Sequence, residues 1–182
     1  MANVTLHVGT GTFLPVKSER MAEHPMHGEQ VRIPRTTVQE LRDAIGQRPI
    51  VPVGTTALRT IESLCWFGDD LLNGADPDHL DVRQWRPYDE GPRDTVDALE
   101  AVLRWMDEHM IAEVNGQSSL LIAPGYRFRL AEGLVTNFHQ PGSTLLLLVA
   151  AFIGDNWRKV YQHALANDYR FLSYGDGSLL WR

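Results

Sequence analysis

The chain has 182 residues, enough for one domain with a buried core, and 43% hydrophobic and 22% charged residues are typical of a globular protein. A transmembrane protein is not expected, because the longest apolar run, Leu145 to Ile153, is too short to cross a bilayer. The single cysteine, Cys65, excludes an internal disulfide, and the N-terminal sequence MANVTLHVG has no signal-peptide pattern. We therefore expect a cytoplasmic protein with no membrane partner.

The net charge of -6 is unevenly distributed along the chain. Residues 65–113 hold 13 Asp/Glu and 4 Lys/Arg, a net charge of -9, whereas the remainder holds 10 acidic and 13 basic residues, a net charge of +3. The overall sign is unfavourable for nucleic acid, but the basic side chains outside this segment could still meet phosphates.

The predicted elements alternate between strands and helices. In chain order we expect strands at 4–8, 49–53, 119–123, 134–136, 169–174 and 178–181, and helices at 37–45, 55–64, 94–110, 145–153 and 155–166. Residues 15–34 are predicted to be irregular, and residues 66–92 to form a long loop. This order predicts an α/β fold with a mainly parallel sheet flanked by helices. We expect one domain over residues 1–182, with an acidic helical excursion at about 66–113.

Three of the helix starts carry capping signals. Thr37 and Glu40 have the spacing of a capping box, and Ser143 and Asp155 precede the two C-terminal helices. The capping role is the simplest explanation of the pair Ser143 and Thr144.

Three polar turns follow β-rich runs, at residues 8–12, 53–56 and 135–139. Ligands of open parallel sheets bind beyond the carboxyl ends of the strands, where these turns would lie together. Glycine allows close backbone approach, and Thr and Asn supply neutral hydrogen bonds. The free N–H groups of a helix start favour a carboxylate or a phosphate. Each turn alone could be only a turn; the shared position makes a ligand site the better hypothesis.

The titratable candidates each have a structural alternative. The set of His24, His27 and Glu29 could hold a metal, contact an organic ligand or be structural, and it lacks the spacing of a helical metal motif. His139 is the best candidate for a general base, the alternative being a histidine bonded to backbone. Cys65 is expected to be a buried helix thiol.

Arg59 and Glu62 lie three residues apart on a predicted helix directly after the 53–56 turn. This spacing fits an ordinary surface pair or a clamp on a ligand anion, and the sequence leaves both hypotheses open.

Several stretches in register resemble the S-adenosylmethionine:tRNA ribosyltransferase-isomerase family of queuosine biosynthesis. They are VTLHVGTGTFLPV, HPMHGE, VGTTALRTIES, APGYRF, LVTNFHQPGSTLLLLVAAF and YRFLSYGDGSLL, which together span nearly the whole chain.

The resemblance implies an enzyme with S-adenosylmethionine as a substrate and no metal. It would transfer and isomerise the ribosyl part of S-adenosylmethionine onto 7-aminomethyl-7-deazaguanine in tRNA, giving epoxyqueuosine, adenine and methionine. The sulfonium acidifies the neighbouring C5′ hydrogens, so that a base can remove one of them. The resulting carbanion-like carbon then meets the acceptor, and closure to the epoxide expels methionine.

The resemblance also directs attention to particular residues. We expect His139 or His27 as the base, with Asp176 as an alternative. Arg59 is the expected anion clamp, and the expected ligand contacts are Thr10, Gly11, Thr12, Glu29, Thr55, Thr56, Asn137 and Tyr174.

Members of this family usually have about twice this length. The chain resembles their C-terminal portion, without the N-terminal part of the α/β domain and without an inserted small β-barrel domain. We therefore expect tRNA and S-adenosylmethionine as partners, together with a homodimer or an N-terminal partner segment that covers the open sheet edge. The alternatives are a non-catalytic remnant that binds nucleotide or tRNA, and a paralogue that acts on a free small molecule.

Overall fold

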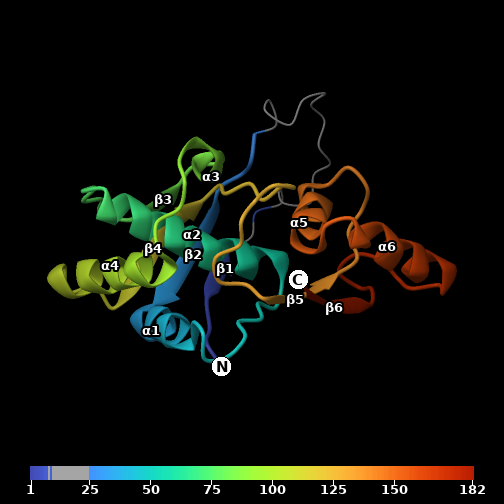
Figure 1. Cartoon of the computed structure of the whole chain (residues 1–182), viewed down its shortest axis with the longest axis horizontal. Helices are drawn as coiled ribbons and strands as arrows, with labels where there is room; N and C mark the ends of the chain where they lie inside the picture. Colours follow the sequence, from blue (N-terminus) through green and yellow to red (C-terminus); the bar gives the residue numbers. More distant parts are fainter. Residues whose placement is uncertain (8, 10–24) are drawn as a thin grey trace.

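The computed structural model describes residues 1–7, 9 and 25–182, which form two groups of elements around one long helix (Figure 1). Helix α2 (Thr55–Leu72) begins beside the group that holds the C-terminus and runs into the group that holds the larger sheet. The two groups share a continuous hydrophobic core, to which α2 contributes Leu58, Leu64 and Phe67. No described helix is both long and apolar enough to cross a membrane.

The larger sheet has the strand order β1-β2-β4-β3. Strand β2 (Glu29–Pro34) pairs antiparallel with β1 (Thr5–His7) and with β4 (Glu113–Ser118), and only β3 (Leu80–Val82) runs parallel to its neighbour β4. The predicted α/β class is confirmed, but this sheet is mixed rather than mainly parallel. Strand β2 shows the reason, since its side chains alternate between buried and exposed, as is typical of antiparallel strands with one solvated face.

A second, two-stranded sheet pairs β5 (Gly133–Asn137) antiparallel with β6 (Gly177–Trp181). The predicted parallel pairing is found beside it, where Ile50 bridges Ala131 and Val53 bridges Val135. These isolated bridges replace the strand predicted at 49–53, and they set residues 50–53 and β5 in the same direction.

The helices largely follow the predicted order, but one is longer than predicted and one short helix was not predicted. They are α1 (Arg35–Ala44), α2, α3 (Arg86–Asp89), α4 (Thr95–Glu108), α5 (Thr144–Ile153) and α6 (Asn156–Ala166). Helix α2 continues to Leu72, and β3 and α3 follow it, so residues 66–92 are not one long loop. Helices α1 and α4 lie beside the larger sheet, and α5 and α6 lie beside β5 and β6 (Figure 1).

Besides residues 49–53, two further predicted strands are absent, for different reasons. Residues 119–123 are extended and largely buried, and they bond to residues 82–84 through Ser119 N–H and Leu121 N–H, but the strand itself is β4, which precedes them. Residues 169–174 are interrupted at Leu172, whose φ of 68° places it in the left-handed region.

The capping predictions are partly confirmed. The side chain of Ser143 accepts the N–H of Leu146, and Asp94 caps α4 in the same way. The capping box at Thr37 is wrong, because α1 begins after Pro34 and the Thr37 hydroxyl instead donates to the carbonyl of Asn3 at 2.8 Å. Asp155 occupies the N-cap position of α6 without a side-chain hydrogen bond.

A buried carboxylate fixes α2 to the chain that leads into β5. Glu62 is fully buried, and it accepts the backbone N–H groups of Arg129, Leu130 and Ala131 at 3.0 to 3.2 Å. The hydroxyl of Tyr126 donates to the same carboxylate at 2.9 Å. The hypothesis of an exposed Arg59–Glu62 pair is therefore wrong, because a helix buried on most sides turns its charged groups into internal anchors.

Two helical turns further along α2, a buried ion pair joins the same two segments. Asp69 binds the guanidinium of Arg129 at 2.7 and 3.0 Å. The ring of Trp66 lies under the guanidinium groups of Arg129 and Arg86, at 5.2 and 5.3 Å from its centroid. Helix α2 is thus held to residues 126–131 by charge as well as by apolar packing.

Replacing Glu62 by Gln is expected to destabilise the fold by about 3 kcal/mol, because an amide NH₂ would face backbone N–H donors that lose their acceptor. Chemical denaturation measures this loss. Glu132→Gln, a substitution of an exposed carboxylate in the same region, is the matched control and should change the unfolding free energy by less than about 0.5 kcal/mol. Equal effects of the two substitutions would contradict the anchoring role.

Candidate functional site

A pocket of about 430 Å³ opens at the carboxyl ends of residues 50–53 and β5. Two of the three predicted turns meet there, which confirms their shared position. The pocket is lined by Leu6, Val53, Gly54, Thr55, Thr56, Ala57, Thr136, Asn137, His139, Gln140, Pro141, Ser143, Leu145, Leu172 and Ser173.

The backbone of the turn at residues 53–56 directs the N-terminus of α2 toward this pocket. Gly54 N–H donates to the carbonyl of Val135 at 2.8 Å, and Val135 N–H donates to the carbonyl of Pro52 at 3.0 Å. Gly54 has a φ of 96°, a conformation that favours glycine, and it gives α2 no side-chain cap. The first N–H groups of α2, at Thr55 and Thr56, therefore remain available to a ligand anion or oxygen.

His139 is held from two sides at the end of β5. Its Nε2 lies 2.9 Å from the hydroxyl oxygen of Thr136, and its backbone N–H donates to the hydroxyl of Tyr161 at 2.9 Å. The side chain is largely buried, and this burial lowers the pKa of His139 to about 4. His139 is therefore neutral near pH 7.

The far wall of the pocket is the loop before β6. The side-chain amide of Asn137 donates to the carbonyls of Gly175 and Asp176 at 3.5 and 3.4 Å, and Leu172 N–H donates to the carbonyl of Phe138 at 2.9 Å. These bonds place Leu172 and Ser173 against the pocket. Asn137 thus supports the site wall in addition to lining it.

The described lining contains no Asp, Glu, Lys or Arg, and His139 is its one titratable side chain. Thr, Ser, Asn and Gln provide neutral donors and acceptors, and Val53, Leu145 and Leu172 provide apolar surface. Phosphate sites usually use Arg or Lys, so this lining is better suited to an uncharged polar group such as a nucleoside.

Three predicted site residues lie elsewhere in the described structure. His27 is exposed just before β2, and Tyr174 is 97% exposed. The carboxylate of Asp176 accepts the backbone N–H of Arg170 at 2.8 Å and lies 3.9 Å from the guanidinium of the same residue. None of the three lines the described pocket.

The predicted clamp Arg59 is also outside the lining. It forms a buried ion pair with Glu29, which joins α2 to the start of β2. Breaking a pair of this kind leaves a buried charge without compensation, at a cost of about 3 to 5 kcal/mol. Contacts of Glu29 and Arg59 with a ligand stay predictions, and the structure gives them an additional role in joining helix and sheet.

Thr10, Gly11 and Thr12 lie outside the described residues, as does His24. The role of the turn at residues 8–12 therefore stays a prediction.

Sequence reasoning did not single out several lining residues, although two of them directly follow His139; they are Leu6, Ala57, Gln140, Pro141, Leu145, Leu172 and Ser173. It also missed Tyr161, which reaches His139 from α6. Its helical position carried no signal for this long-range bond.

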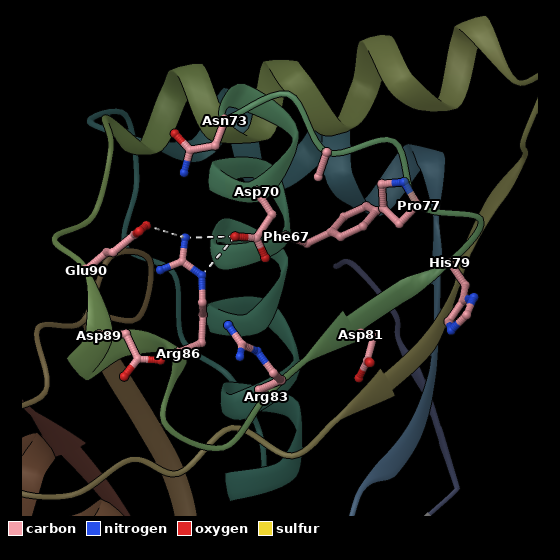
Figure 2. A pocket seen from close by; sticks show the side chains of 11 residues that line it. Phe67, Asp70, Asn73, Pro77, His79, Asp81, Arg83, Arg86, Asp89 and Glu90 are labelled. Carbon is pink, nitrogen blue, oxygen red and sulfur yellow. Dashed lines mark hydrogen bonds and ion pairs between the residues drawn. The ribbon is translucent and has the colours of Figure 1, made fainter.

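A second hollow, of about 380 Å³, lies between the end of α2, β3 and α3 (Figure 2). Arg86 lies between Asp70 and Glu90, at 2.8 and 3.5 Å, and Asp81 and Asp89 are near the rim (Figure 2). Asp70 and Glu90 both pair with Arg86, and the described residues contain no cluster suited to a metal ion. The charged side chains in this hollow form ion pairs that fix α3 against α2.

The comparisons with known proteins cover almost the whole chain. Residues 1–180 match the family described as queuosine biosynthesis protein. The S-adenosylmethionine:tRNA ribosyltransferase-isomerase of Phenylobacterium zucineum is 43% identical over 182 residues, which cover 98% of this chain and 40% of the relative. The protein of the same name from Cereibacter sphaeroides is 42% identical over 180 residues, with coverages of 97% and 40%.

A crystal structure of an S-adenosylmethionine tRNA ribosyltransferase from Thermotoga maritima is also similar. Its TM-score is 0.57 at 31% identity, and the match covers 98% of this chain and 44% of that chain. The chain therefore spans about two fifths of the length of the curated relatives it matches.

The lowered pKa of His139 predicts a pH-dependent stability. The unfolded chain binds a proton at this residue below about pH 6.5, whereas the folded chain does so only near pH 4, so stability present above pH 6.5 is lost as the pH falls toward 4. The loss amounts to about 3 kcal/mol. Denaturation at pH 7 and pH 4.5 should show a smaller difference for His139→Gln than for wild type.

His27→Gln, which removes an exposed histidine, is the control and should retain the wild-type pH dependence. An unchanged pH dependence in His139→Gln would contradict the burial of a neutral imidazole at this position.

Proposed function

The chain belongs to the queuosine biosynthesis protein family, and we propose that it forms the S-adenosylmethionine site of a tRNA ribosyltransferase-isomerase. The observation that supports this function is the uncharged pocket between the start of α2 and the end of β5. The activity, the substrates and the partners are proposed for this chain, because it spans only part of the length of its relatives.

The lining residues can supply the kinds of contact that the proposed substrate needs. A ribose and an adenine ring need neutral hydrogen-bond partners and apolar contact surface, which Thr56, Asn137 and Leu145 can supply. The first N–H groups of α2 suit the methionine carboxylate. The described lining contains no Lys or Arg, whose charge would repel a positively charged sulfonium.

The proposed reaction starts at the carbon next to the sulfonium. A base removes a C5′ proton, the ribosyl group is transferred to the aminomethyl nitrogen of the acceptor base in tRNA, which gives up a proton, and adenine and methionine leave. His139, His27 and Asp176 are the proposed bases. His139 is the one of these three that lines the pocket, and burial keeps it neutral; whether it accepts or donates a proton depends on its tautomer.

The proposed partners follow from the same family. tRNA is the proposed acceptor substrate, and an enzyme acting on tRNA is expected in the cytoplasm. A homodimer or an N-terminal segment is the proposed cover for a hollow of about 750 Å³ beside residues 1–6 and 48–53, where apolar side chains such as Val4 and Ile50 line the wall.

A second function, transfer to a free small molecule, is favoured by one observation, the net charge of -9 over residues 65–113. Part of this charge is compensated by arginines outside the segment, because Asp69 pairs with Arg129, Glu100 pairs with Arg42 and Asp107 pairs with Arg35. The compensation weakens the repulsion of tRNA phosphates, so tRNA remains the preferred acceptor.

Calorimetric titration of the folded chain with S-adenosylmethionine tests the site. Ala57→Leu places a larger side chain in the pocket wall and should weaken binding at least tenfold, a loss of about 1.4 kcal/mol. Ala166→Leu adds the same side chain at an exposed position of α6 and should bind as wild type does. A folded wild-type chain that does not bind S-adenosylmethionine would contradict the proposal.

An adenine-release assay then separates the alternatives. Release with acceptor tRNA supports the proposed transfer. Release with free 7-aminomethyl-7-deazaguanine alone identifies the small-molecule function, and binding without release identifies a binding remnant.

A further inference from the structure

We propose that Thr136 fixes the tautomer of His139, so that the imidazole presents its Nδ1–H to the ligand as a hydrogen-bond donor. The identity of the ligand rests on the proposed S-adenosylmethionine site. The tautomer itself rests on the geometry of the end of β5 alone.

The two side chains form a closed pair. The hydroxyl oxygen of Thr136 lies 2.9 Å from Nε2 of His139, and both residues are buried, with 6% and 8% of their surface exposed. The pair is rigid, because Thr136 belongs to the β5–β6 ladder and the backbone N–H of His139 is bonded to Tyr161.

The proton in this contact is assigned by counting donors and acceptors. A threonine hydroxyl has one hydrogen to donate, and Nε2 is the acceptor that the described residues offer to it. If Nε2 carried a hydrogen, two donors would face each other unless the hydroxyl turned its hydrogen toward the pocket, where the described residues offer it no acceptor. The favoured arrangement has the hydroxyl donating to an unprotonated Nε2.

The other ring nitrogen keeps accessible surface. Nδ1 has no hydrogen-bond partner among the described residues, and it is not one of their fully buried unpaired polar atoms, while His139 as a residue lines the pocket. In a neutral imidazole with an unprotonated Nε2, the hydrogen is on Nδ1. The pKa of about 4 agrees with a neutral ring and does not itself select the tautomer.

This arrangement gives His139 a binding role. Nδ1–H suits an acceptor atom of the ligand, such as a ring nitrogen of the base, a ribose oxygen or the carboxylate. A neutral donor also does not repel a sulfonium, as an imidazolium would. A protonated Nδ1 has no lone pair for a proton, so in this state the base of the reaction is another group.

The tautomer is measurable without any ligand. Nitrogen NMR of the chain with ¹⁵N-labelled histidine distinguishes a protonated from an unprotonated ring nitrogen, and the His139→Gln variant assigns the signals among the seven histidines. Near pH 7 the wild type should show a protonated Nδ1 and an unprotonated Nε2. Thr136→Ser, which keeps the hydroxyl, should show the same pattern, and Thr136→Val should shift the hydrogen toward Nε2.

Titration with S-adenosylmethionine supplies the second readout. Thr136→Val should bind about tenfold more weakly than wild type, whereas Thr136→Ser should bind within about twofold of it. A protonated Nε2 in the wild type, or an unchanged tautomer in Thr136→Val, would overturn the inference. Absence of binding by the wild type would overturn the proposed function and leave the tautomer result standing.

Discussion

The structure depends on the buried carboxylate of Glu62, which sets the position of α2 against residues 129–131. Three backbone N–H groups on one carboxylate define the position of the chain more closely than apolar packing would, because hydrogen bonds are directional. Eight residues earlier on the same helix, Gly54 bonds to Val135. The helix start and the end of β5 are therefore placed relative to each other by the same pair of segments, and the pocket lies where they meet.

This arrangement accounts for the uncharged lining of the pocket. The charged side chains of α2 are used within the fold: Arg59 pairs with Glu29, and Asp69 pairs with Arg129. What remains at the pocket is the partial positive charge of the helix start and a set of neutral side chains. A zwitterionic nucleoside with a carboxylate at one end and a sulfonium near its centre is compatible with both features.

The sequence predicted the location of the site better than its contacts. The turns at 53–56 and 135–139 were predictable because glycine and polar residues directly follow β-rich runs, and their parallel pairing then brings them together. Buried ion pairs were not predictable, since Arg59 and Glu62 at helical spacing resemble an exposed pair. Strand β4 was missed because of its Gly and polar residues; a Cβ on Gly116 would lie 1.9 Å from the carbonyl oxygen of Leu80, so only glycine permits the β3–β4 pairing. The loop at 169–174 has a strand-like sequence but turns at Leu172, for which no local signal exists.

The central claim is that S-adenosylmethionine binds between the start of α2 and the end of β5. Backbone amide shift mapping by NMR, with S-adenosylmethionine added to the labelled chain, tests it most directly. The account predicts that the largest changes occur at residues 54–57, 136–143 and 172–173, which line the pocket. Changes concentrated instead at the hollow around Arg86, or no changes in a folded chain, would contradict it.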